Sequence, residues 1–170
     1  MNEKELVKKA KQGDKDSFCE LYGLYKDRLY RYAFYRLGDP EDAQDAVSDC
    51  IVSAFEQIKN LRSADAFHSW IFRILHITCI KYVKQQINAR ETSDIDDFKN
   101  SAELSHNDSN TSSELKEALE ILTDEEREIV LLCVVAGLTS KETARLVDMT
   151  SGGVRSKLSR SLRKMRDFLG

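Results

Sequence analysis

The sequence predicts an all-α protein: two small helical domains joined by an acidic flexible linker, the second domain containing a helix-turn-helix. Three observations lead to this prediction. Apolar residues recur at helical spacing through most of the chain. Proline occurs once, at Pro40, and glycine only seven times, which favours helices over a β architecture. Residues 88–113 are rich in serine, asparagine and acids, so the domains are expected at 1–87 and 114–170.

Composition narrows the function classes. The 170 residues carry a net charge of -3, so nucleic-acid contact would have to come from local basic patches. The four cysteines form no Cys-x-x-Cys pair, so we expect reduced core thiols and neither a metal site nor a cofactor. No apolar run approaches about twenty residues and no signal-peptide pattern is present, which predicts a cytoplasmic protein without membrane insertion.

The N-terminal domain should contain four helices. The first opens around Leu6 and ends near Gly13, and the second follows over residues 16–37 with many aromatic side chains. Pro40 suits the first turn of the third helix, because a proline there leaves no intrahelical hydrogen bond unmade. Along this third helix Asp42, Asp45 and Asp49 step by three and four residues and so line one exposed acidic face.

The fourth helix begins near Phe67 and mixes aromatic with cationic side chains. Such a mixture suits unstacked bases, because every base offers a π-face and the strand offers phosphates. The alternative is that the rings pack a helical core, and for most of them, Trp70 included, packing is the favoured interpretation. The candidate contacts to single-stranded DNA are Phe67, His68, Trp70, Arg73, His76, Lys81 and Lys84.

The C-terminal domain reads as a helix-turn-helix. A helical apolar run stops at Gly137, and a short helix follows with Thr139 or Ser140 as its N-cap. Asp148 to Thr150 make a tight turn, after which a basic helix starts, capped by Thr150 or Ser151. The acidic linker before this domain should tether the two domains so that each can engage a separate site.

The basic helix has two faces. Val154, Leu158, Leu162 and Met165 step by four, four and three residues and are expected to form its buried stripe. Off that stripe the helix carries six cations, and such a helix can enter the major groove, although a merely solvated basic face is the alternative. Arg155, Ser156, Ser159 and Arg160 are expected to face the bases, and the glycines at the start to admit a phosphate. The full candidate set is Ser151, Gly152, Arg155, Ser156, Lys157, Ser159, Arg160 and Arg163.

This order of features resembles the bacterial RNA polymerase sigma factors of the extracytoplasmic-function (ECF) type, in the sigma-70 superfamily. The resemblance rests on the acidic helix at 39–49, the tryptophan-bearing helix, the acidic linker and the helix-turn-helix introduced by 122–130. It implies a transcription initiation factor that binds core RNA polymerase, reads two elements of promoter DNA and has a cognate anti-sigma partner. It further implies that the helix from Phe67 reads and melts the downstream (minus-ten) element and that residues 140–160 read the upstream (minus-thirty-five) element. The segment expected to dock on the polymerase clamp holds Asp42, Asp45, Ser48 and Asp49.

Some positions depart from the family pattern. Ser48 stands where a glutamine is usual and Ile51 where an aromatic is usual, while Ile77 and Lys81 replace an asparagine and an aspartate of the melting helix. Two alternatives therefore stay open: a degenerate sigma relative that docks on polymerase without opening DNA, and a one-component helix-turn-helix regulator with a helical sensing domain. The sequence shows no P-loop, no nucleophile–base pair and no paired carboxylates in an apolar setting, so we expect no enzymatic activity.

Overall fold

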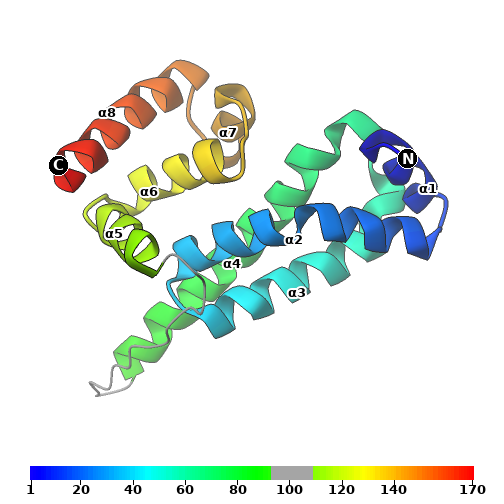
Figure 1. The fold of residues 1–170 in the computed structure, drawn as a ribbon, viewed down its shortest axis with the longest axis horizontal. Helices are drawn as coiled ribbons and strands as arrows, with labels where there is room; N and C mark the ends of the chain where they lie inside the picture. Colours follow the sequence, from blue (N-terminus) through cyan, green and yellow to red (C-terminus); the bar gives the residue numbers. More distant parts are fainter. Residues whose placement is uncertain (93–108) are drawn as a thin grey trace.

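The computed structural model describes residues 1–92 and 109–170, and every regular element in these ranges is helical (Figure 1). The prediction of an all-α fold is confirmed. Residues 88–92 of the predicted linker continue the preceding helix and residues 109–113 start the next one, while 93–108 lie outside the described residues. Within the described ranges, no helix combines the length and the apolarity needed to cross a membrane.

Four helices build the N-terminal domain: α1 (Glu3–Lys11), α2 (Lys15–Leu37), α3 (Pro40–Gln57) and α4 (Phe67–Thr92). Helices α2, α3 and α4 run alongside one another, and α1 packs at the end where α2 begins (Figure 1). Gly38 ends α2 in the left-handed region at a φ of 73°, and Asp39 then caps α3 with its carboxylate. The interior is aromatic: Phe72 lies with its ring 6.1 Å from that of Tyr32, and both side chains are fully buried.

The C-terminal domain consists of α5 (Ser109–Glu120), α6 (Asp124–Val130), a π-helical turn (Leu131–Val135), α7 (Ser140–Val147) and α8 (Ser151–Leu169). Of the alternative caps, Thr139 is the one that caps α7 and Thr150 the one that caps α8. Asp148 turns the chain between them in the left-handed region at a φ of 56°, which a short polar side chain tolerates. Capping and turn residues close in sequence therefore define where the two helices of the helix-turn-helix begin and end.

The buried stripe of α8 differs from the one predicted. Leu162 is 40% exposed, and Ser161 is fully buried in its place. A helix turns about 100° per residue, so Leu162 lies about 80° beyond Val154 around the axis, whereas Ser161 lies within about 20° of it. The inward positions are Val154, Leu158, Ser161 and Met165. Phe55 and Val134, two large apolar residues elsewhere in the fold, are exposed as well.

The two domains pack against each other instead of standing apart as separate tethered units. Leu131, Leu132, Ala136 and Leu138 of the C-terminal domain belong to the same buried apolar cluster as the core of the N-terminal domain. The π-helical turn that carries the first two of these residues lies directly against α2. Sequence periodicity marks these positions as apolar but cannot say which domain covers them.

Thr139 and Glu142 hold the start of α7 through a reciprocal pair of hydrogen bonds. Each side chain accepts from the other residue's backbone N–H, at 3.0 and 2.9 Å. Replacing Thr139 by alanine should lower the free energy of unfolding by about 1 kcal/mol, because one backbone donor loses its partner. Urea denaturation measures this, with Thr139→Ser as the control that keeps the acceptor. Equal stability of the alanine and serine variants would contradict a capping role.

Candidate nucleic-acid and partner interfaces

The exposed side of α8 carries Arg155, Ser156, Ser159 and Arg160, which we call the upstream face. The opposite side is anchored by Val154, which packs into a small core with Ile129 and Ala144. Within the described ranges neither arginine of the upstream face forms an ion pair, so both guanidinium groups keep their donors available. This is the arrangement that a helix needs in order to place donors in a DNA groove.

The remaining cations of α8 are divided. Lys157 is half-buried and paired with Glu125 of α6, and Lys164 lies 2.8 Å from the nearer oxygen of Glu126. Lys157, predicted among the DNA contacts, is therefore engaged within its own domain, whereas Arg163 is exposed. Glu125 and Glu126 precede their partner lysines by 32 and 38 residues, so sequence alone does not show which lysines they face.

The first turn of α8 leaves little space around its backbone. Gly152 is exposed, whereas a Cβ at Gly153 would lie 3.1 Å from Oγ1 of Thr150 and 3.3 Å from Cε of Met149. Thr150 Oγ1 also accepts the Gly153 N–H at 3.0 Å, so the cap and the close approach involve the same pair of residues. A glycine at position 153 fits this crowding because it has no Cβ. Ser151 is half-buried in the same turn.

Asp42, Asp45 and Asp49 lie on α3 as the sequence predicted, and we call this the acidic face. Tyr82 Oη donates to Asp49 at 2.7 Å and Gln86 Nε2 donates to Asp42 at 2.7 Å, both from α4. Asp45 and the neighbouring Ser48 are exposed. Partial burial and the Asp49 carboxylate raise the pKa of Tyr82 to about 12, so it remains a donor at neutral pH. This support from α4 could not be predicted from the sequence, because it joins residues far apart in the chain.

Two predicted single-strand contacts prove to be interior. Phe67 is 2% exposed and His76 is 3% exposed, so neither side chain can reach DNA in this arrangement. Phe67 packs edge-on against Tyr25, with ring centroids 5.3 Å apart, and is tilted against Trp70 at 5.8 Å. Both residues occur on the inward side of α4 because a 26-residue helix against a core must bury one of its faces.

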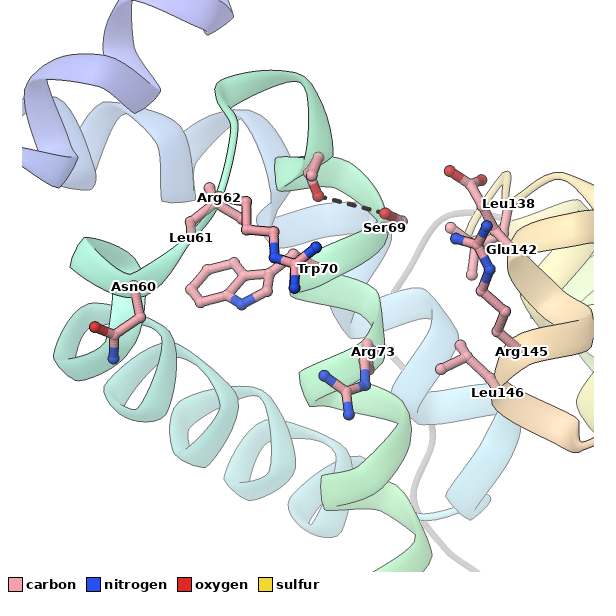
Figure 2. A pocket seen from close by; sticks show the side chains of 11 residues that line it. Asn60, Leu61, Arg62, Ser69, Trp70, Arg73, Leu138, Glu142, Arg145 and Leu146 are labelled. Carbon is pink, nitrogen blue, oxygen red and sulfur yellow. Dashed lines mark hydrogen bonds between the residues drawn. The ribbon is translucent and has the colours of Figure 1, made fainter.

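The other predicted contacts on α4 differ in their surroundings. Trp70 is half-buried and, with Arg73, faces a cleft of about 600 Å³, and we call this side of α4 the downstream face. Across the cleft lie Arg145 and Leu146 of α7, so the wall opposite belongs to the other domain (Figure 2). His68 is half-buried beside it, and Lys81 and Lys84 are exposed further along α4.

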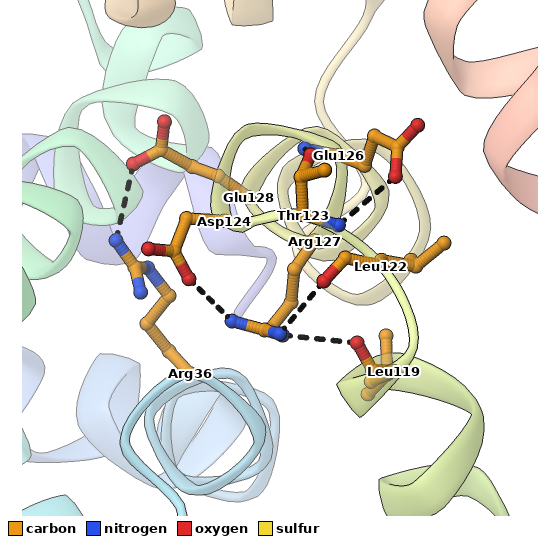
Figure 3. A network of polar contacts seen from close by, with 8 residues as sticks. All are labelled: Arg36, Leu119, Leu122, Thr123, Asp124, Glu126, Arg127 and Glu128. Carbon is orange, nitrogen blue, oxygen red and sulfur yellow. Dashed lines mark hydrogen bonds and ion pairs between the residues drawn. The ribbon is translucent and has the colours of Figure 1, made fainter.

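A buried polar cluster joins the domains. Arg36 Nη2 of α2 lies 3.4 Å from Oε2 of Glu128 of α6, as Figure 3 shows, and the same oxygen lies 3.7 Å from Nδ1 of His76. Tyr32 Oη lies 3.3 Å from that nitrogen. Burial and the Arg36 cation lower the pKa of His76 to about 4, against a weaker opposing effect of the Leu146 carbonyl. Burial likewise raises the pKa of Glu128.

The neutral state of His76 should make stability depend on pH. In the unfolded chain the imidazole would titrate near its ordinary value of about 6.5, above its folded pKa of about 4. The unfolded state then binds more protons between these values, so the free energy of unfolding should fall as pH is lowered, by about 3 kcal/mol in total. The raised pKa of Glu128 acts in the opposite sense, so the comparison must be made with a His76→Gln variant.

Urea denaturation of both proteins at about pH 7 and about pH 4.5 measures this difference. The native chain should lose more stability on acidification than His76→Gln does. Identical losses in the two proteins would show that His76 does not titrate differently on folding.

The described residues hold no cluster of three or more histidine, cysteine, aspartate or glutamate side chains placed to bind a metal ion. Cys50 and Cys79 are buried, and burial raises the pKa of each thiol to about 12. The three faces defined above are surfaces: the upstream and downstream faces carry arginine, and the acidic face carries aspartate.

Two family models match the chain. Sigma-70 region 2 matches residues 21–88, which contain the acidic and downstream faces, and sigma-70 region 4 matches residues 112–165, which contain the helix-turn-helix. Together they span most of the sequence and correspond closely to the two domains.

Characterised relatives carry the same assignment. The chain is 28% identical to the ECF RNA polymerase sigma factor BldN of Streptomyces coelicolor, over 97% of this chain and 65% of BldN. It is 28% identical to the ECF RNA polymerase sigma factor SigE of Mycolicibacterium smegmatis, over 90% of this chain and 62% of SigE. The chain thus spans a little under two thirds of the length of these two relatives. For RNA polymerase sigma factor SigV of Bacillus subtilis, at 28% identity, the match covers 93% of this chain and 94% of SigV.

Solved structures share the fold. CnrH, determined in complex with the cytosolic domain of CnrY, superposes with a TM-score of 0.73 at 21% identity, over 98% of this chain and 96% of CnrH. Sigma factor RpoE of Bartonella quintana, in complex with the anti-sigma factor NepR, gives a TM-score of 0.70 at 20% identity, over 92% and 98%. Because both region models match in the expected order, and relatives match along almost the whole chain, the chain belongs to the ECF sigma factors of the sigma-70 family.

Proposed function

We propose that the chain is a transcription initiation factor that binds core RNA polymerase and directs it to specific promoters. The acidic face would dock on the polymerase, the upstream face would read the upstream element, and the downstream face would contact the downstream element. The factor would act by binding, with no reaction of its own, and in the cytoplasm, where transcription takes place. Its family membership supports this assignment of roles.

One observation carries the proposal furthest: α8 is anchored by buried Val154 while Arg155 and Arg160 are exposed on its other side. Arginine can donate two parallel hydrogen bonds to a guanine edge, and the small Ser156 and Ser159 beside it let the helix approach the bases. Phosphate contact alone would not require small residues between the cations. Sequence-specific reading is therefore the favoured role of this face.

A protein partner is part of the proposal. The acidic face offers carboxylates held in place by α4, and such complementarity mainly sets partner choice and association rate. Of the proteins that share this fold, CnrH was determined in complex with the cytosolic domain of CnrY, and RpoE in complex with the anti-sigma factor NepR. We infer that this chain also has an anti-sigma partner.

Transcription in vitro tests the proposal. Core RNA polymerase is supplied with a library of genomic promoter fragments, with and without the chain, and the transcripts are sequenced. Specific new start sites support an initiation factor. Polymerase binding without new transcripts would instead indicate a degenerate relative, an alternative favoured by exposed Ile77 and Lys81 on the melting helix. Selective DNA binding without any effect of polymerase would indicate a one-component regulator.

A further inference from the structure

We propose that the contact between the two domains is an intramolecular lock: in the isolated chain the C-terminal domain covers the downstream face, while the upstream face remains open. What the covered face reads rests on the proposed function. The existence of the lock does not depend on the proposed function, because it follows from contacts between the domains.

Buried apolar side chains hold the two domains together in the lock. Leu131 and Leu132 of the π-helical turn are fully buried, and so is Ala136. They share one continuous cluster with the core of the N-terminal domain, and the turn packs against α2. Separation of the domains would expose this apolar surface to water, which is unfavourable, so the isolated chain should prefer the closed arrangement.

A hydrogen bond between the two domains lies beside the downstream face. His68 Nε2 lies 2.7 Å from the carbonyl oxygen of Ala136, and since a carbonyl only accepts, the imidazole donates. The other ring nitrogen lies 3.1 Å from Tyr25 Oη, which fixes the orientation of the ring. Gly137 follows directly, with a φ of 75°, and a Cβ there would lie 3.7 Å from His68 Nε2. The end of the π-helical turn therefore lies on His68, two residues before Trp70.

An ion pair also joins the two domains. Arg36 is 9% and Glu128 is 17% exposed in their side chains, and they pair across the two domains. A buried ion pair is sensitive to loss of one member, because the remaining charge is left without its partner in a poorly hydrated place. In a separated chain both groups would return to water. Disruption of this pair is therefore expected to open the lock without unfolding either domain.

The geometry of the cleft explains why closure would mask DNA contact. A volume of about 600 Å³ between Trp70 and Arg73 on one wall and Arg145 on the other suits a small molecule. A run of nucleotides needs an open groove along which bases stack and phosphates pass. Arg73 is exposed but lines this cleft, whereas Arg155 and Arg160 of the upstream face are exposed and do not line it. The isolated chain should thus present one reading surface and hide the other.

The test uses Glu128→Arg, which places a second cation beside Arg36. The matched control is Glu117→Arg, an equal charge change at an exposed position of α5. Small-angle X-ray scattering should give a larger radius of gyration for Glu128→Arg and an unchanged one for the control, with equal helix content by circular dichroism. A compact Glu128→Arg chain with native helix content would overturn the lock, whatever the protein's function.

If Glu128→Arg loses helix content, His68→Phe decides by the same scattering criterion. It keeps an aromatic ring and removes the donor to Ala136, together with the ring nitrogen beside Tyr25 Oη within the N-terminal domain. Expansion supports the lock and a native radius overturns it. Both results are read against the native chain in the same buffer.

The masking claim is tested with a labelled single strand that carries the downstream element of a promoter transcribed by the chain with core polymerase. If the closed state makes up about 90% of molecules or more, opening should raise affinity for this strand by about tenfold or more. Affinity for the upstream duplex should stay the same. An opened chain with unchanged single-strand affinity would overturn masking, whereas absence of any transcribed promoter would count against the proposed function instead.

Discussion

Replacing Arg155 and Arg160 together by alanine is expected to abolish selective recognition of the upstream element while core polymerase still binds the chain. Each lost bidentate contact to a base weakens binding by about 1–3 kcal/mol, so two would remove about 2–6 kcal/mol if their effects add. Neither side chain forms an ion pair within the described ranges, so removal leaves no buried group unpaired. The loss should appear in DNA binding and not in folding.

Fluorescence anisotropy with the polymerase-bound chain measures this effect on two duplexes, one native and one with a scrambled upstream element. The double variant should bind both equally, whereas the native chain should prefer the first. Arg166→Ala is the control, since it removes an exposed cation in the last turn of the same helix. A double variant that still distinguishes the duplexes would show that the upstream face does not read bases.

The helix-turn-helix could be predicted because its signals are local. The cap at Thr139 reaches Glu142 only three residues on, and Asp148 takes the left-handed conformation by virtue of its own short side chain. Such features depend only on residues a few positions apart in the sequence. The buried stripe of α8 was misplaced by one residue because Leu162 is apolar and Ser161 is not, whereas helix geometry places the serine inward.

The contact between the domains could not be predicted. Arg36 and Glu128 are separated by 92 positions, and neither departs from the polar pattern of an exposed helix face. His76 has the same ambiguity: beside aromatics it reads as a nucleic-acid contact, and only the fold shows it under α6 and α7. Periodicity tells which residues avoid water but not which distant element covers them.

Reversing Asp45 and Asp49 to lysine should strongly weaken binding to core polymerase. Like charges brought together across an interface oppose binding by several kcal/mol, which corresponds to a fall in affinity on the order of 100-fold or more. Folding should hardly change, because exposed carboxylates contribute at most about 1 kcal/mol each. Asp49 would give up the hydrogen bond from Tyr82, whereas Asp45 is exposed and has no ion pair within the described ranges.

A matched double variant, Glu20→Lys with Asp27→Lys, makes the same change in net charge at exposed positions of α2, a helix that carries no part of the acidic face. Titration of labelled core polymerase at low and at physiological salt should separate the two variants. The acidic-face variant should be weak at both salt concentrations, since its charges would be buried against the partner and poorly screened. The control should differ from the native chain only at low salt, where long-range attraction acts. Equal behaviour of the two variants would mean that net charge, and not docking through α3, governs the association.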